Sequence, residues 1–393
     1  MGEMRKLKCL LMTQVLKHMV RGKTDPYTWI FSSVDNCYYN YNSRYLFEYV
    51  KEHIPEVTPY FVINNPERRQ KLSEEYGEKY FIEAESIEGV LKVLEAGVWF
   101  TSAGLPVYGI GLEKGRLIIN LWHGVPLKKI ALLDPNLGRT ARLYFRMIFS
   151  KNYSCILTTS SILVPVMARS FDVPESKVKI WGQPRNDGLF RRLDRTVWLR
   201  EIFGELPKYQ KTILYAPTFR DYNGVKLFPF EDYEYEKLQD FLEQEKIILF
   251  LRTHISEKEE VNRYLGERIR YLGNEQAEDV TGFLNAFDCL VTDYSSIYVD
   301  YLLTDHPIIF LPYDRDAYLD ERGMNFDYDD VTPGPKPETM EEFFECIKEG
   351  LKENDPWKKE RGRVNALLNE VREPCCGSIC RRVLKRIKKQ EEK

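Results

Sequence analysis

Short apolar runs alternate with amphipathic stretches through the first half of the chain. The apolar runs are 27–33, 58–65, 98–102 and 116–122, and helical spacing of apolar residues occurs at 43–54 and 89–97. Short buried runs separated by helical patterns are typical of βαβ units. The pattern therefore predicts a parallel sheet covered by helices.

The same alternation restarts after an irregular, polar stretch that follows Pro184. Strand-like runs lie within 211–221, 246–254, 288–296 and 306–312, and helical patterns at 235–244, 279–287 and 297–303. The fold class expected is α/β, with two doubly wound domains facing each other across a cleft. The domains expected are 25–195 and 196–350, preceded by an amphipathic helix in 1–24 and followed by a basic helical tail in 351–393.

Both ends of the chain carry apolar residues at helical spacing among basic ones. The apolar positions are Leu7, Leu11, Val15 and Met19 at one end, and Ile379, Val383 and Ile387 at the other. The basic positions are Arg5, Lys6, Lys8, Arg381, Arg382, Lys385, Arg386, Lys388 and Lys389. Two interpretations stay open at each end: a helix lying on an anionic membrane surface, or a helix packed on its own domain with a solvated charged face.

Composition excludes several classes of protein. A formal net charge of -3 gives no general attraction to nucleic acid. The longest uncharged apolar stretch, 96–112, contains Pro106 and several glycines and is shorter than a membrane span, so a strand followed by a loop is expected there. The eight cysteines show no zinc-type spacing and suit a reducing compartment.

Polar side chains with phosphate-binding or proton-transfer chemistry follow four of the expected strands. They are His123 and Gly124; Thr218, Arg220 and Asp221; Arg252, Thr253 and His254; and Asp293, Ser295 and Ser296. Ligands of doubly wound sheets bind beyond the carboxyl ends of the strands. Because these groups come from both halves, they predict one site between the domains.

Each group has a chemical and a structural interpretation. Ser295 and Ser296, at the first turn of a helix, form a phosphate seat or serve with Asp293 as helix caps. Arg185, followed by Asn186 and Asp187 in "GQPRND", pairs with phosphate or belongs to a salt-bridged loop. His123 is interpreted as a general base, and Gly124 as the point where backbone approaches the ligand.

Six segments in order resemble the CDP-glycerol glycerophosphotransferase family of teichoic-acid synthesis. They are "LWHGVPLKKI", "GQPRNDGL", "ILYAPTFRD", "FLRTHI", "VTDYSSIYVDYLL" and "PIIFLPYDRDAYLDERGMNFDYDD". The resemblance implies a GT-B fold, a base at His123, and a place for His254 near the donor phosphates. Phe219 and Ile255 depart from the common tryptophan and proline of the family, which leaves a CDP-polyol other than CDP-glycerol open.

The activity expected is transfer of glycerol phosphate from CDP-glycerol to a hydroxyl of a polyprenyl-diphosphate-linked disaccharide, with release of CMP. We expect a primase working peripherally at the cytoplasmic face of the membrane, on the inner leaflet, with no required cofactor and no nucleic acid partner. Asp293 could hold a divalent metal, but capping or hydrogen bonding is favoured. Alternatives are a glycerol- or ribitol-phosphate polymerase, a GT-B glycosyltransferase that uses a nucleotide sugar, and a non-catalytic scaffold; the oligomeric state is open.

Overall fold

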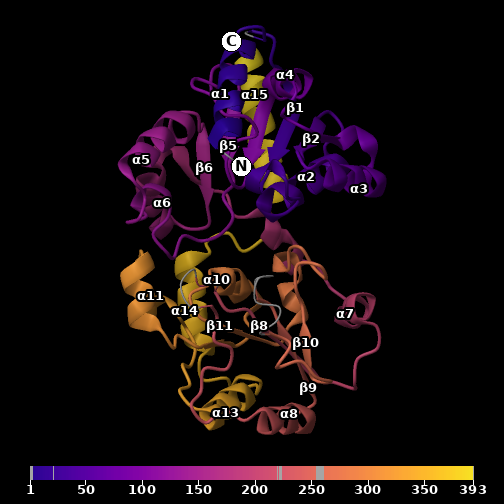
Figure 1. The fold of residues 1–393 in the computed structure, drawn as a ribbon, viewed down its shortest axis with the longest axis vertical. Helices are drawn as coiled ribbons and strands as arrows, with labels where there is room; N and C mark the ends of the chain where they lie inside the picture. Colours follow the sequence, from indigo (N-terminus) through magenta and orange to yellow (C-terminus); the bar gives the residue numbers. More distant parts are fainter. Residues whose placement is uncertain (1–2, 21, 219, 221–223, 254–260, 393) are drawn as a thin grey trace. The chain divides into compact units, whose positions relative to one another are not determined.

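The computed structural model describes residues 3–20, 22–218, 220, 224–253 and 261–392. The side chains of 3–7 are outside that description. The chain forms two compact units: unit 1 comprises 1–187 and 370–393, and unit 2 comprises 188–369. Each unit is built on one sheet (Figure 1).

Unit 1 contains a seven-stranded sheet in the order β3-β2-β1-β4-β5-β6-β7. Its strands are β1 (Asp25–Ser32), β2 (Thr58–Val62), β3 (Phe81–Ile82), β4 (Ala96–Thr101), β5 (Leu117–Asn120), β6 (Cys155–Thr158) and β7 (Val178–Ile180). All of these pairings are parallel, with Ile30 of β1 opposite Trp99 of β4. All six residues of β4 are buried, as expected of a central strand covered on both faces.

Helices cover both faces of this sheet. They are α1 (Glu3–Leu16), α2 (Tyr41–His53), α3 (Pro66–Tyr76), α4 (Ile87–Glu95), α5 (Arg139–Phe145), α6 (Val164–Phe171) and α15 (Cys376–Glu391). Although α15 comes last in the sequence, it lies among the elements of unit 1 (Figure 1). Its residues Ile379, Val383 and Ile387 are buried in the same apolar cluster as Phe31 and Phe47. The C-terminal segment is therefore part of the core of unit 1.

Unit 2 contains a five-stranded parallel sheet in the order β10-β9-β8-β11-β12. The strands are β8 (Lys211–Tyr215), β9 (Ile247–Leu251), β10 (Ile269–Tyr271), β11 (Cys289–Thr292) and β12 (Ile308–Phe310). The helices are α7 (Arg195–Phe203), α8 (Tyr235–Gln244), α10 (Ile297–Tyr301), α11 (Arg315–Arg322), α12 (Tyr328–Val331), α13 (Met340–Gly350) and α14 (Lys358–Leu368). The direction of strand order reverses between β8 and β11, which is where doubly wound sheets bind ligands.

The expected α/β class with parallel sheets is confirmed, but the division of the chain differs from the one expected. The units separate at 187/188 and again at 369/370, rather than at 195 and 350. The expected tail 351–393 is split: α14 belongs to unit 2, and α15 returns to unit 1. Long-range packing of α15 on α2 causes this return, and no local pattern could show it.

The two ends of the chain also differ in what they leave exposed. The apolar side of α15 is buried, so packing on its own domain is what the structure shows there, and its six basic residues stay exposed. In α1 and the turn after it, by contrast, part of the apolar side is exposed. Leu11, Val15 and Met19 are 58–67% exposed, whereas Leu16 and Val20 are buried. No helix in the described part of the chain is long and apolar enough to cross a membrane. The segment 96–112 is β4 and a loop, as expected.

Candidate active site

His123 lies just beyond β5, and its ring is oriented by a backbone carbonyl. The Nδ1 atom is 2.8 Å from the carbonyl oxygen of Ser102, the residue that follows β4. A carbonyl oxygen only accepts hydrogen bonds, so Nδ1 carries the proton of the neutral ring. The lone pair is therefore on Nε2, as a general base requires.

Two aromatic residues with left-handed backbone contact the imidazole. Tyr41 has a φ of 56° and Trp122 a φ of 55°, a conformation that bulky residues rarely adopt. The ring centroid of His123 is 5.2 Å from that of Tyr41 and 4.1 Å from that of Trp122. Such backbone strain persists only where surrounding contacts impose it, and it is frequent at functional sites.

The surroundings keep His123 neutral. Partial burial lowers the pKa of His123, the Ser102 carbonyl opposes this shift, and the positive charge of Arg185 adds to it; together they bring the pKa to about 4. At neutral pH the imidazole is thus an uncharged proton acceptor.

A buried hydrogen-bond network fixes the segment that carries His123. Asn42, at the start of α2, donates from Nδ2 to the carbonyl oxygens of Leu121 (3.2 Å) and Trp122 (2.9 Å), and its Oδ1 accepts from the Arg185 N–H (3.1 Å). Arg185 in turn donates from Nη1 to the carbonyl oxygen of His123 at 2.6 Å. Asn42 was not among the residues expected from the sequence, and its position at a helix start gave no signal of this role.

The "GQPRND" segment (182–187) joins this network to the C-terminal helix. Asp187 accepts from the backbone N–H groups of Cys375 (2.7 Å) and Cys376 (3.0 Å), so it caps α15. Gly182 has a φ of +84°, and a Cβ there would meet Val371 at 2.9 Å. Asn186 is buried beside these residues. The expected role of Arg185, Asn186 and Asp187 at the donor phosphates stays a prediction.

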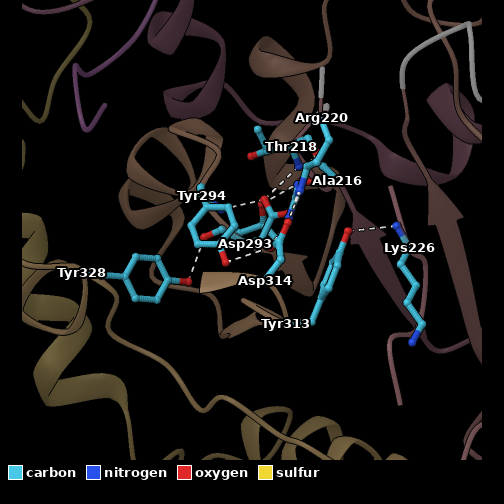
Figure 2. Close-up of polar contacts among 10 residues, drawn as sticks. Ala216, Thr218, Arg220, Lys226, Asp293, Tyr294, Tyr313, Asp314 and Tyr328 are labelled. Carbon is cyan, nitrogen blue, oxygen red and sulfur yellow. Dashed lines mark hydrogen bonds and ion pairs between the residues drawn. The ribbon is translucent and has the colours of Figure 1, made fainter. Parts of the chain in front are cut away.

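In unit 2, Arg220 joins two carboxylates at the carboxyl end of the sheet. Its guanidinium donates to Asp293, which follows β11, at 2.6 Å and in a two-pronged manner to Asp314 at 2.9 Å (Figure 2). The Arg220 side chain is fully buried. Burial alone would lower the pKa of Arg220, but Asp314 and Asp293 outweigh it, so the pKa is raised and the charge is permanent.

Neighbouring groups complete the arrangement around Asp293. Its Oδ1 accepts from the Thr218 N–H at 2.8 Å, and its carbonyl oxygen accepts from the Tyr328 hydroxyl at 3.0 Å (Figure 2). The ring of Tyr294 lies 5.2 Å from the Arg220 guanidinium, and its hydroxyl donates to Asp314 at 3.0 Å. These contacts fix the segment after β8, and among the described residues the buried Thr218 Oγ1 has no hydrogen-bond partner. The sequence showed the motif that contains Asp314 but did not single out this carboxylate.

Arg252 follows β9, and its side chain forms hydrogen bonds within unit 2. Its guanidinium donates to the carbonyl oxygens of Leu272 (3.1 Å) and Ala277 (3.0 Å) and to Asn274 Oδ1 (3.1 Å). Thr253 is buried beside it. These bonds anchor the segment 272–278, and contact of Arg252 with phosphate stays a prediction.

Ser295 and Ser296 precede α10 and are partly exposed, and their contact with phosphate stays a prediction. Ser295 Oγ accepts from the Ile297 N–H at 3.4 Å, which is the capping alternative, and the helix has only five residues. His254 and Asp221, with Phe219 and Ile255, lie outside the described residues. Within the described ranges, no three His, Cys, Asp or Glu side chains are grouped as metal ligands; whether the activity needs a metal stays untested.

Each unit is a doubly wound parallel sheet with polar side chains beyond the carboxyl ends of its strands, which is the architecture of an α/β protein that binds its ligands there. A family model described as CDP-Glycerol:Poly(glycerophosphate) glycerophosphotransferase matches residues 13–389. The chain therefore belongs to this family, and the resemblance expected from the six motifs is confirmed.

Characterised relatives and solved structures agree with this assignment. The chain is 28% identical to a teichoic acid poly(glycerol phosphate) polymerase of Bacillus subtilis (strain 168), over 82% of this chain but only 44% of that protein. It is 28% identical to a teichoic acid glycerol-phosphate transferase of Staphylococcus aureus (strain NCTC 8325 / PS 47), over 81% of this chain and 82% of that one. A structure of the wall teichoic acid polymerase TagF matches 97% of this chain and 94% of its own with a TM-score of 0.79 and 22% identity, which establishes the shared fold.

Proposed function

We propose that the protein transfers glycerol phosphate from CDP-glycerol to a hydroxyl of a lipid-linked saccharide acceptor and releases CMP. The observation that carries the proposal is the orientation of His123, whose Nδ1–H bond to Ser102 leaves Nε2 as a proton acceptor. Family membership supports the donor class, and a TagF variant has been studied after soaking with CDPG.

In this reaction the acceptor hydroxyl oxygen attacks the β-phosphorus of CDP-glycerol. The bond between that phosphorus and the CMP oxygen breaks, and the proton of the attacking hydroxyl passes to Nε2 of His123. The charge that develops on the phosphoryl oxygens needs fixed donors. Thr218 Oγ1, the Ser295 and Ser296 hydroxyls, and the expected contacts of Arg252 and His254 would supply them from unit 2.

The buried Asp293–Arg220–Asp314 cluster has a different part in this proposal. Two carboxylates and one guanidinium carry a net charge of about -1 under the usual ionisation states, so the cluster does not attract a diphosphate. Its bonds to the Thr218 N–H and to the segment after β12 instead shape the donor seat. Arg220 and Asp293 would thus act as positioning residues rather than as phosphate ligands.

We further propose that α1 and its following turn touch the membrane that carries the acceptor. Leu11, Val15 and Met19 are exposed, and Ile110 of the adjoining loop, whose carbonyl oxygen accepts from Lys17 Nζ at 2.7 Å, is 41% exposed. Partial insertion of such side chains is worth up to about 1.5–3 kcal/mol each. The exposed basic residues of α15, and Lys8, would add electrostatic attraction to an anionic leaflet.

The test is product analysis with purified protein, CDP-glycerol and a short-chain diphosphate-linked disaccharide. Mass spectrometry should show the acceptor with added glycerol phosphate and equimolar CMP: one unit for the primase that we favour, a ladder for a polymerase. His123→Asn, with an unchanged fold by circular dichroism, should reduce turnover by about 10²–10⁴-fold. Transfer from a UDP-sugar instead, or full activity of His123→Asn, would refute the proposal.

CDP-ribitol is the alternative donor to include in the same assay. The chain is 29% identical over 247 residues to a teichoic acid poly(ribitol-phosphate) polymerase of Bacillus spizizenii (strain ATCC 23059 / NRRL B-14472 / W23). Preference for CDP-ribitol would change the transferred polyol and leave the roles of the residues unchanged.

A further inference from the structure

A small cavity lies in unit 1 next to the residue that follows His123. Gly124, Trp122, Thr158 and Gln183 line it together with apolar side chains that include Leu157 and Met167. Its volume of about 10 Å³ is far below the roughly 300–1,000 Å³ of an ordinary ligand pocket. That is room for a single water-sized group.

Gln183, which lines this cavity, carries a buried hydrogen-bond donor. The side chain is 5% exposed, and its Nε2 has no partner among the described residues. Its Oε1 accepts from Asn42 Nδ2 at 3.3 Å, which fixes the direction of the amide. An unpaired buried N–H is costly, so a site that retains one is suited to a ligand oxygen that pairs with it.

The position ties this donor to the reacting centre. Asn42 binds Gln183 and the carbonyl oxygen of Trp122 at once, and Arg185 binds the carbonyl oxygen of His123. The cavity and the segment that carries the base are therefore connected by the same hydrogen-bond network. Its walls are largely apolar, so they fit an uncharged carbon-bound hydroxyl rather than a phosphate oxygen.

We infer that this cavity seats the acceptor hydroxyl next to the one that reacts, with Gln183 Nε2 donating a hydrogen bond to its oxygen. The inference rests on the proposed function and adds a specificity-determining residue to it. The acceptor class is then a polyol or sugar with two neighbouring hydroxyls. An acceptor with a lone hydroxyl leaves the amide unpaired and binds less well.

A thermodynamic cycle tests the inference by changing one protein side chain and one hydroxyl of the acceptor. The probes are the short-chain, diphosphate-linked disaccharide used in the product assay, and the analogue of it that lacks the hydroxyl next to the reacting one. The wild type should prefer the complete acceptor by about 10- to 100-fold in kcat/KM. Gln183→Met, which is similar in size and has no donor, should lose most of that preference while KM for CDP-glycerol is unchanged. Equal preference in wild type and Gln183→Met would show that the cavity holds only water and would overturn the inference.

Calorimetry of both acceptors without CDP-glycerol separates the inference from the proposed function. A difference in affinity that vanishes in Gln183→Met, in a protein that transfers nothing from CDP-glycerol, would keep the seat and refute the reaction. Transfer from CDP-glycerol without any preference between the two acceptors would refute the seat and support the proposed reaction. A changed pKa of His123 in Gln183→Met would show that the substitution acts on the base instead, and this too would overturn the inference.

Discussion

The unusual acidity of His123 gives the sharpest prediction, because it can be measured without any substrate. A histidine with an ordinary pKa of 6.5 would be about 3% neutral at pH 5. With the pKa of about 4 that burial and Arg185 give His123, about 90% is neutral at that pH. Acidification from pH 7 to pH 5 should therefore leave the base almost fully competent.

The measurement is an NMR titration of protein labelled with ¹³C at histidine Cε1, with the His123 signal identified by its loss in His123→Asn. The kcat/KM for the acceptor should show an acid limb with the same midpoint, since kcat/KM reports ionisations of the free enzyme. Because the native pKa lies below the unfolded one, the contribution of His123 to stability is present above pH 6.5 and is lost as the pH falls towards 4. A His123 midpoint near 6.5 would refute the account of its surroundings.

Four further perturbations follow from the contacts described. Arg220→Lys keeps the charge but loses the two-pronged hydrogen bonds, so we expect a lower melting temperature and a loss of about 1–3 kcal/mol in the free energy of unfolding; unchanged denaturation curves would contradict it. Arg252→Ala should raise KM for CDP-glycerol and speed hydrogen exchange in 272–278, whereas normal exchange would argue against the anchor. Ile379→Ala should cost about 2–5 kcal/mol in chemical denaturation, against less than about 0.5 for the exposed control Lys385→Ala. Replacing Leu11, Val15 and Met19 by serine should weaken sedimentation with anionic vesicles even at high salt. Glutamine in place of the basic residues of α15 should weaken sedimentation only at low salt; these residues are Arg381, Arg382, Lys385, Arg386, Lys388 and Lys389. If both variants sediment like the wild type, the membrane proposal is refuted.

Sequence patterns identified the strands that matter most, because central parallel strands are continuous apolar runs. β4, β9 and β11 are buried throughout and were found from this signal. The strands β7 and β10 give no such run, because each buries only its first residue and carries a charged residue in the middle. The helix α7 lies in the stretch after Pro184 that had been interpreted as irregular.

The residues of the candidate site, too, could be predicted only in part from the sequence. His123 could be found from the sequence because an isolated histidine after an apolar run is unusual. Its tautomer could not, because the Ser102 carbonyl belongs to the segment that follows a different strand, β4. The left-handed backbone of Trp122 has no local signal, since bulky residues do not favour it. Likewise, the charge of Arg252 predicted an anionic ligand from the sequence. The carbonyl oxygens that Arg252 binds could be identified only from the fold.

The return of α15 to unit 1 has a consequence for how the chain is made. The last strand of the unit 1 sheet, β7, ends at Ile180, but the helix that covers part of that core begins only at Cys376, after the whole of unit 2. At about 5–20 residues per second, a ribosome needs about 10–40 s to synthesise unit 2. During that interval the apolar surface around Phe31 and Phe47 has no cover from α15. Unit 2 can close as soon as it emerges, whereas unit 1 is completed only after α15 has been made, so nascent unit 1 exposes apolar surface for longer than unit 2 does.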